Sequence, residues 1–219
     1  RVDDNTISVA ANDCDFLVTK KDTNTEKRYT VNGFLSTENK IGKNLEELLA
    51  CMAGKVSYLG GEFAVFAGTY ALSNAVINED MLIDTLNLSA NSIRTAANGA
   101  RGIYTSQDID WKEDEYPLYQ SATDLAEDGS QTRFIDLPLR LTKSASTAQR
   151  IAKINVKRTR CSRKLTLRTC MEELMIRTGD VISIESSKSE VDSGVYEVQS
   201  MAINNSTEPY IELQLLETK

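Results

Sequence analysis

An α+β fold, mainly antiparallel strands in a barrel or sandwich with two helices, is predicted by three features of the sequence. Several short segments alternate apolar with polar residues, as Leu137, Leu139 and Leu141 do, which is typical of half-buried strands. Short connections between these segments favour antiparallel pairing. Apolar residues at helical spacing predict helices at 44–53 and 147–161. Strands that must bury one face beside such helices favour this architecture.

We expect a small α+β unit at residues 1–75. Its first 28 residues are polar and predict one strand near Phe16, with a loop or hairpin tip over 19–28. A strand at 29–35 precedes the helix at 44–53, which Asn44 would cap and Gly54 would end. The unit then closes with a hairpin at 55–67, which turns at Gly60-Gly61.

The second expected domain, at residues 76–219, is a β-barrel-like unit containing the helix 147–161. A Ser-x-x-Gln capping box at 146–149 predicts where that helix begins. The segment 91–98 has no clear pattern, and 108–128 reads as a long polar loop. The remaining predicted elements are a helical turn at 78–82, strands at 86–88, 99–105, 136–141, 165–168, 181–184, 195–199 and 210–215, and a turn at 204–209.

The composition is that of an ordinary globular protein with an acidic balance. The chain has 219 residues, 41% of them hydrophobic, and a formal net charge of -7. This charge argues against a general nucleic-acid binder, which is usually basic. No apolar run reaches the ~18 residues that a membrane-spanning helix needs. We expect no nucleic acid and no membrane span, and synthesis in the cytoplasm with reduced cysteines.

Several kinds of chemistry are excluded by residues that the chain lacks. It has no histidine, so Ser-His and Cys-His nucleophilic catalysis and Cys/His zinc sites are ruled out. Its four cysteines form no Cys-x-x-Cys pair, and Cys51, inside a helical apolar segment, reads as a buried thiol. There is no glycine-rich phosphate loop. We therefore predict no catalytic residue, no cofactor and no metal ion, and a protein that is not an enzyme.

Two segments of opposite charge are the candidate contact surfaces. The hypothesis is that a basic helix face and an acidic loop meet across a subunit boundary and set its register. The alternative is that both are simply solvated. The loop carboxylates could also bind a cation, but their spacing is not that of an EF-hand loop. They could also act as an acid/base pair for sugar cleavage, but that chemistry needs a fixed separation between two carboxylates, which the sequence does not show. The candidate contact residues are Arg150, Lys153, Lys157 and Arg160 on the helix, and Asp108, Asp110, Glu113, Asp114 and Glu115 in the loop.

Several segments, in their order and spacing, carry a family resemblance over roughly residues 28–219. They are Arg-Tyr-Thr-Val-Asn-Gly at 28–33, Leu-Ala-Cys-Met-Ala-Gly at 49–54, Tyr58 to Gly68, Asn98 to Tyr104, Leu137-Pro-Leu, Ala148 to Ile154, Gly179-Asp-Val and Val195-Tyr-Glu-Val. Together they resemble the tail-tip, host-specificity protein J of lambda-type bacteriophages and related prophage and gene-transfer-agent tail proteins.

The resemblance implies a structural protein of the virion, at the tail tip. Family members are baseplate-hub proteins, trimers of β-barrel domains that close the tail tube and take part in tail assembly and host attachment. Expected partners are other copies of the chain, other tail proteins and, through a C-terminal region that this chain lacks, the host surface. We expect an internal fragment of such a protein. The alternatives are a glycan-binding or glycan-cleaving tail module using the acidic loop 108–115, and a generic β-rich interaction domain.

Overall fold

The computed structural model describes residues 1–59, 61–69, 73–84, 86–90, 96–161, 163–170, 176–185, 194–205 and 208–218. The chain folds into two compact units and passes between them more than once. Unit 1 comprises Arg1–Val56, Phe63–Thr69 and Ala96–Arg160, and unit 2 comprises Ser57–Glu62, Tyr70–Thr95 and Cys161–Lys219. This division is interleaved, and so differs from the expected boundary between residues 75 and 76.

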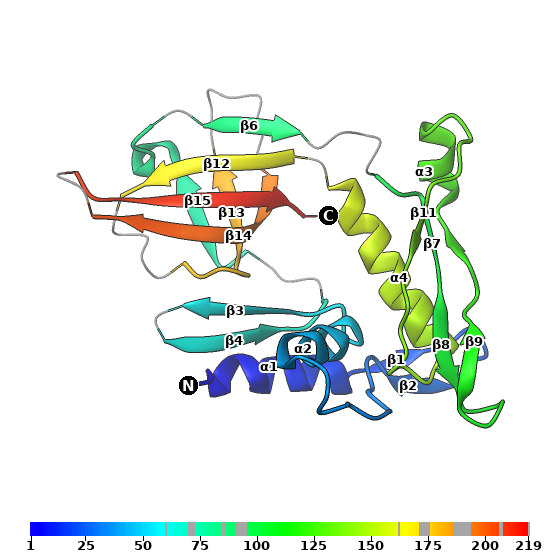
Figure 1. Cartoon of the computed structure of the whole chain (residues 1–219). Coiled ribbons are helices and arrows are strands. Elements are labelled where there is room, and N and C mark those ends of the chain that lie inside the picture. Colours follow the sequence, from blue (N-terminus) through cyan, green and yellow to red (C-terminus); the bar gives the residue numbers. More distant parts are fainter. Residues whose placement is uncertain are drawn as a thin grey trace. The chain divides into compact units, whose positions relative to one another are not determined.

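Unit 1 is built around a long helix, α4, Ala145–Arg160. A three-stranded sheet of order β10-β7-β11 and the hairpin β8–β9 lie beside it (Figure 1). The other elements are α1 (Asp4–Asp15), β1 (Leu17–Thr19), β2 (Thr25–Lys27), α2 (Ile41–Ala50), β7 (Gly99–Arg101), β8 (Ile103–Ser106), β9 (Lys112–Glu115), β10 (Tyr119–Gln120), α3 (Ala122–Glu127) and β11 (Phe134–Asp136). A further hairpin, whose residues Ser57–Glu62 belong to unit 2, joins β3 (Lys55–Leu59) to β4 (Glu62–Phe66).

The core of unit 1 lies where α4 packs on β7, β8 and β10. Ala148, Ile151, Ala152 and Val156 lie on one side of α4 and are fully buried, so they form the apolar stripe of this helix. The small alanines let the helix approach the sheet, where Ala100 of β7 is also fully buried. Tyr29, Ala53, Tyr104, Tyr116 and Leu139 complete the buried part of this cluster.

Unit 2 contains a six-stranded sheet of order β5-β13-β14-β15-β12-β6. Every neighbouring pair is antiparallel except β5 and β13, which are parallel. A register shift interrupts the pairing of β14 with β15 between Val198 and Ser200. The strands are β5 (Ala75–Asn78), β6 (Asn87–Ala90), β12 (Arg163–Thr169), β13 (Val181–Glu185), β14 (Gly194–Asn204) and β15 (Tyr210–Glu217), and a short 3-10 helix, η1 (Glu79–Met81), follows β5.

Alternation of buried and more exposed residues along β12 and most of β15 places the core of unit 2 on one face of the sheet. Leu165 and Leu167 of β12 and Ile211, Leu213 and Leu215 of β15 are at most 1% exposed. Alternate residues of a strand point to opposite faces, so this single pattern buries a continuous apolar layer. The outward face is polar, with Arg168 of β12 contacting Glu212 of β15.

The predicted α+β class is confirmed, but closure into a barrel is not found. Within the described ranges no sheet closes on itself, because the two outer strands of the large sheet, β5 and β6, do not pair. The same ranges hold four α-helices, where the sequence predicted two. The prediction missed α1, whose Asp3 N-cap accepts a hydrogen bond from the Asn5 amide but which buries only Ala10. It also missed α3, inside the segment read as a loop.

Other local predictions differ in their detail. The segment 29–35 is irregular instead of a strand, and 137–141 forms only an isolated bridge at Leu139. Helix α2 begins after Lys40, so Asn44 lies inside it and not at its N-cap. Helix α4 begins at Ala145, ahead of the expected capping box, and the Ser144 hydroxyl accepts a hydrogen bond from the Thr147 amide at 3.5 Å. The segment 91–98 and the turn 204–209 lie partly outside the described residues. Several local predictions are confirmed. They are the hairpin 55–67, the helical turn at 78–82, the buried Cys51 thiol, and the strands near Phe16 and at 86–88, 165–168, 181–184, 195–199 and 210–215.

We predict that Leu213→Ala lowers the free energy of unfolding by about 2–5 kcal/mol, because it leaves a cavity in the buried layer of unit 2. Urea denaturation followed by circular dichroism measures this. The control is Leu88→Ala on β6, where the side chain is 51% exposed. Equal effects of the two substitutions would contradict the assigned core.

Candidate assembly surfaces

Helix α4 carries the basic face that the sequence singled out. Lys153 and Lys157 are exposed, whereas Arg150 and Arg160 are each about three-quarters or more buried and point into networks of the same chain. The helix ends in a run of basic residues, which suits the negative end of its dipole. The two arginines lie near opposite ends of α4, and each fastens a different part of unit 1 to it.

At the N-terminal end of α4, Glu26 of β2 provides a carboxylate that is only 16% exposed. It accepts hydrogen bonds from the hydroxyls of Ser144, at 2.8 Å, and of Ser146. Thr147 Oγ1 lies 3.3 Å from the same carboxylate, and Arg150 Nη1 donates to it at 2.8 Å. A negative group at a helix N-terminus also meets the positive end of the dipole. The hairpin β1–β2 is thereby fastened to the first turns of α4.

The environment of Glu26 favours its charged form. Burial alone would raise its pKa, but the hydrogen bonds from Ser146, Ser144 and Arg150 outweigh burial, so the pKa lies below the ordinary value of 4.5. The stabilising contribution of this carboxylate is therefore present above the unfolded-state pKa. It is lost as the pH falls through the lower folded-state pKa.

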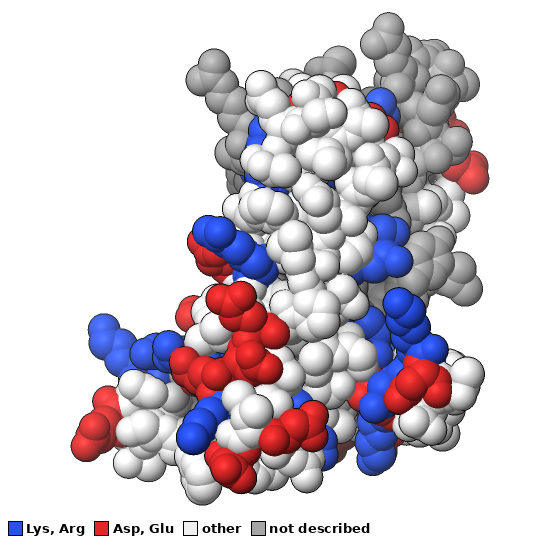
Figure 2. Space-filling view, turned by 90° about the vertical axis from the view of Figure 1, so that its right-hand side faces the viewer, with Lys and Arg blue, Asp and Glu red and all other residues white. Residues whose placement is uncertain are grey.

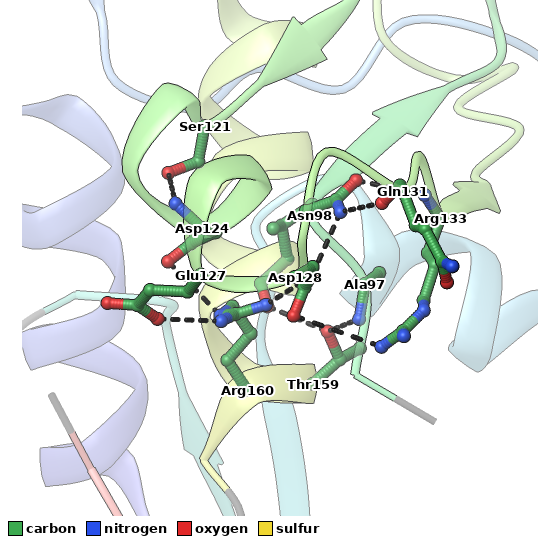
Figure 3. A network of polar contacts seen from close by, with 11 residues as sticks. Ala97, Asn98, Ser121, Asp124, Glu127, Asp128, Gln131, Arg133, Thr159 and Arg160 are labelled. Carbon is green, nitrogen blue, oxygen red and sulfur yellow. Dashed lines mark hydrogen bonds and ion pairs between the residues drawn. The ribbon is translucent and has the colours of Figure 1, made fainter. Parts of the chain in front are cut away.

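At the C-terminal end of α4, Arg160 contacts three carboxylates of α3 and the residue after it (Figure 3). Its Nε lies 3.1 Å from Asp124, and its two terminal nitrogens lie 2.9 Å from Glu127 and from Asp128. A planar guanidinium presents five donors in a fixed fork, which a lysine cannot reproduce. This geometry fixes helix α3 against the last turn of α4.

The same network continues inward through Asn98, which is fully buried. Its Nδ2 donates to Asp128 at 2.9 Å and to the Gln131 carbonyl at 2.6 Å, and its Oδ1 accepts from the Arg133 amide at 2.9 Å (Figure 3). The hydrogen bond from Asn98 lowers the pKa of Asp128; burial acts against it, and Arg160 adds to the lowering. The side chain of Asp128 is 1% exposed, so its charge is held by these partners.

The acidic segment is the β8–β9 hairpin and its turn. Every residue from 107 to 115 is exposed. Asp110 and Trp111 both adopt a left-handed φ of 59°, which is uncommon for residues other than glycine. On the far side of β8, the Thr105 hydroxyl and amide bond to the carbonyls of Arg140 and Thr142, and Arg140 Nε lies 3.0 Å from Glu113. The hairpin is therefore backed by residues 140–142 on one side, while residues 107–115 are exposed.

The structure does not bring the predicted acidic and basic sets together within one chain. Arg150 and Arg160 are engaged by carboxylates that the sequence analysis did not select, while Asp108, Asp110, Glu113, Asp114 and Glu115 all lie on the exposed hairpin. On the face that carries β8 and β9, acidic side chains gather in the lower half with basic ones between them (Figure 2). Contact between the two sets across copies stays a prediction.

Sequence reasoning missed Glu26 and the carboxylates of α3. One signal for α3 was present, because Ser121 three residues before Asp124 is an N-cap pattern, and the Ser121 hydroxyl does accept from the Asp124 amide at 3.4 Å. No comparable signal marks Glu26, since its side-chain hydrogen-bond donors lie 118–124 residues further along the chain.

Metal and membrane sites receive no support from the residues described. Within those ranges, no group of three or more cysteine, aspartate or glutamate side chains could hold a metal ion. None of the described helices has the length and apolar character that spanning a membrane requires.

The comparisons with known proteins identify the class. Residues 40–201 match the model of a family described as "Putative phage tail protein". This match spans more than half of the 219 residues, and the chain belongs to that family of phage tail proteins. None of the curated proteins matches the chain.

Solved structures with a similar fold are also tail or virion proteins. A chain of the virion of a native gene transfer agent particle matches with a TM-score of 0.63 at 13% identity, over 86% of this chain and 42% of that one. The tail protein from Neisseria meningitidis MC58 matches with a TM-score of 0.57 at 12% identity, over 84% of this chain and 57% of that one. The 43 kDa tail protein of prophage MuSo2 from Shewanella oneidensis matches with a TM-score of 0.52 at 7% identity, over 83% of this chain and 52% of that one. The chain thus spans about half the length of these proteins, and the likeness shows a shared fold.

We predict that Glu26→Gln destabilises the protein by about 1.5–3 kcal/mol at neutral pH, because a charged acceptor of several hydrogen bonds is lost. The difference from wild type should begin to shrink as the pH falls below the ordinary pKa of 4.5, where the unfolded chain takes up a proton, and should vanish once the pH passes below the lower folded-state pKa of Glu26. Urea midpoints at a series of pH values measure both effects. Glu46→Gln, on the exposed side of α2, is the matched control. A difference that does not vary with pH would contradict the role of the charge.

Arg160→Lys should lower the free energy of unfolding by about 1–3 kcal/mol, although the charge is kept, because the single ammonium nitrogen of lysine cannot reproduce the planar fork that reaches three carboxylates from three separate nitrogens. Thermal or urea unfolding measures the loss, and hydrogen exchange at the amides of α3 should rise. Lys153→Arg, at an exposed site of the same helix, should leave both readouts unchanged. If Arg160→Lys behaved like this control, the fork geometry would be irrelevant to stability.

Proposed function

We propose that this chain is part of the baseplate hub at the distal tip of a phage or prophage tail, in the host-specificity protein J group, and that it acts in tail assembly and host attachment. The observation that carries the proposal is the family match over residues 40–201. The likeness to a chain of the gene transfer agent virion, at a TM-score of 0.63, supports it. The partners would be further copies of the chain, as a trimer, and other tail proteins.

The chemistry of the described residues suits a role in assembly. The networks at the two ends of α4 hold helices and hairpins in place, so their charged groups serve the fold. The acidic hairpin, by contrast, presents all of β9 at the surface, where a partner can reach it. A protein that acts by contact needs rigid elements that carry exposed side chains, and the β8–β9 hairpin has both.

Glycan binding at the hairpin is a second candidate, favoured by one observation. The Trp111 side chain is 54% exposed and lies between Asp110 and Lys112 in sequence, and aromatic rings flanked by polar groups suit recognition of sugar faces. Glycan cleavage is less favoured, because a general acid needs burial to stay protonated, whereas residues 112–115 are all exposed. Saturable binding of cell-wall glycan, lost in Trp111→Ala, would support this candidate over the hub.

The hub proposal predicts where the protein lies in the particle. An antibody raised against this chain, applied to purified tails from the strain that encodes it, should label the end distal to the head in electron micrographs. Labelling along the tube or at the head-proximal end would overturn the tip assignment, while leaving membership of the tail family intact. Pre-incubation of the antibody with the purified chain should abolish labelling, which serves as the control.

A further inference from the structure

The first half of helix α2 presents apolar side chains that the described part of the chain leaves exposed. None of its ten residues is buried, yet its apolar side chains recur at helical spacing. Ile41 is 87% exposed and Leu45, one turn later, is 38% exposed. In the loop before the helix, Phe34 is 99% exposed, and the Asn44 side chain bonds to the Ser36 carbonyl at 2.9 Å, which ties that loop to α2. Exposed apolar clusters of this kind mark interaction surfaces.

The N-terminus of α2 is also positively charged and lacks a side-chain cap. Lys40 occupies the N-cap position and makes no capping hydrogen bond, Lys43 follows in the first turn, and that turn contains no acidic residue. The first amides of a helix and the positive end of its dipole favour carboxylates. The apolar face of α2 is therefore bordered by a region that prefers an acidic partner.

The β8–β9 hairpin has the complementary character. Its turn exposes two large apolar side chains, Ile109 at 42% and Trp111 at 54%. Five carboxylates and one lysine between residues 107 and 115 give this tip a net charge of −4. Tryptophan is among the residues that are enriched as energetic anchors in protein interfaces.

We propose that the tip of the β8–β9 hairpin of one copy docks on α2 of a second copy. Ile109 and Trp111 would cover Ile41 and Leu45, and the hairpin carboxylates would lie against the lysines at the start of α2. This contact rests on the proposed function, since it assumes that copies of the chain assemble.

The two surfaces are different, so the contact is head to tail. Within unit 1, α2 is drawn well away from β8 and β9 (Figure 1). A heterologous contact of this kind closes into a ring when the rotation between copies allows it. Its charge pairing would make association weaken as salt rises.

Crosslinking between single-cysteine additions tests the contact while keeping its anchors. Gly42→Cys places a thiol on α2 where the added atom meets open space, and Gln107→Cys places one at the exposed start of the hairpin turn. A short bis-maleimide should give several-fold more crosslinked dimer from a mixture of the two variants than from either alone. Introducing Trp111→Ala into the Gln107→Cys variant, or Ile41→Asp into the Gly42→Cys variant, should remove the extra crosslinked dimer. Introducing Ile203→Ala, at an exposed site of β14, should leave the yield unchanged.

Each outcome bears on the contact. A crosslink yield in the mixture no higher than in the separate variants would overturn it, as would a wild-type chain that stays monomeric by light scattering at every concentration and salt. Oligomers by light scattering without the specific crosslink would mean that copies meet elsewhere. Tail-tip labelling in micrographs tests the hub role separately, so the failure of one is not the failure of the other.

Discussion

The cost of holding charge inside a protein is the constraint around which unit 1 is built. Moving a charged group out of water is unfavourable unless partners at the right distances replace its hydration. Glu26 and Asp128 are both removed from solvent, and each is met by an arginine of α4 and by neutral donors. Such groups tolerate few alternative arrangements, because a displaced partner leaves a desolvated charge. The β1–β2 hairpin and α3 are thus each held in one position on the same helix.

This use of charge changes the meaning of the basic helix. A face of four basic residues at spacings of three, four and three reads as a surface for an external acidic partner, but two of the four are already satisfied by the chain itself. Ion pairs at both ends of α4 hold other elements of unit 1 against it, and its small residues pack on the sheet. The acidic hairpin, in contrast, keeps nearly all its carboxylates at the surface, which makes it the stronger candidate for contact with a partner.

Unit 2 follows a simpler rule, which explains how the fold can be shared at 7–13% identity with other tail proteins. Its core needs only apolar side chains of suitable volume at every second position of paired strands, and many sequences satisfy that pattern. The sheet stays open within the described residues, and its outer strands β5 and β6 are short, four residues each. Short outer strands are one way in which proteins limit unwanted pairing of sheets.

The sequence alone was sufficient where the information is local and periodic. The alternation in β12 and β15 and the helical stripe at Ala148, Ile151 and Ala152 predict both the element and its buried face, because each periodicity matches one backbone geometry. It was not sufficient for α1, which buries only Ala10, or for the exact start of α4, since several nearby hydroxyl side chains can cap a helix. The partners of Arg150 and Arg160 were decided in three dimensions. Glu26 lies more than a hundred residues from Arg150 in the sequence. Only the packing of the β1–β2 hairpin against α4 brings them together, so the sequence pattern assigns Arg150 to the surface although its charge is paired within the fold.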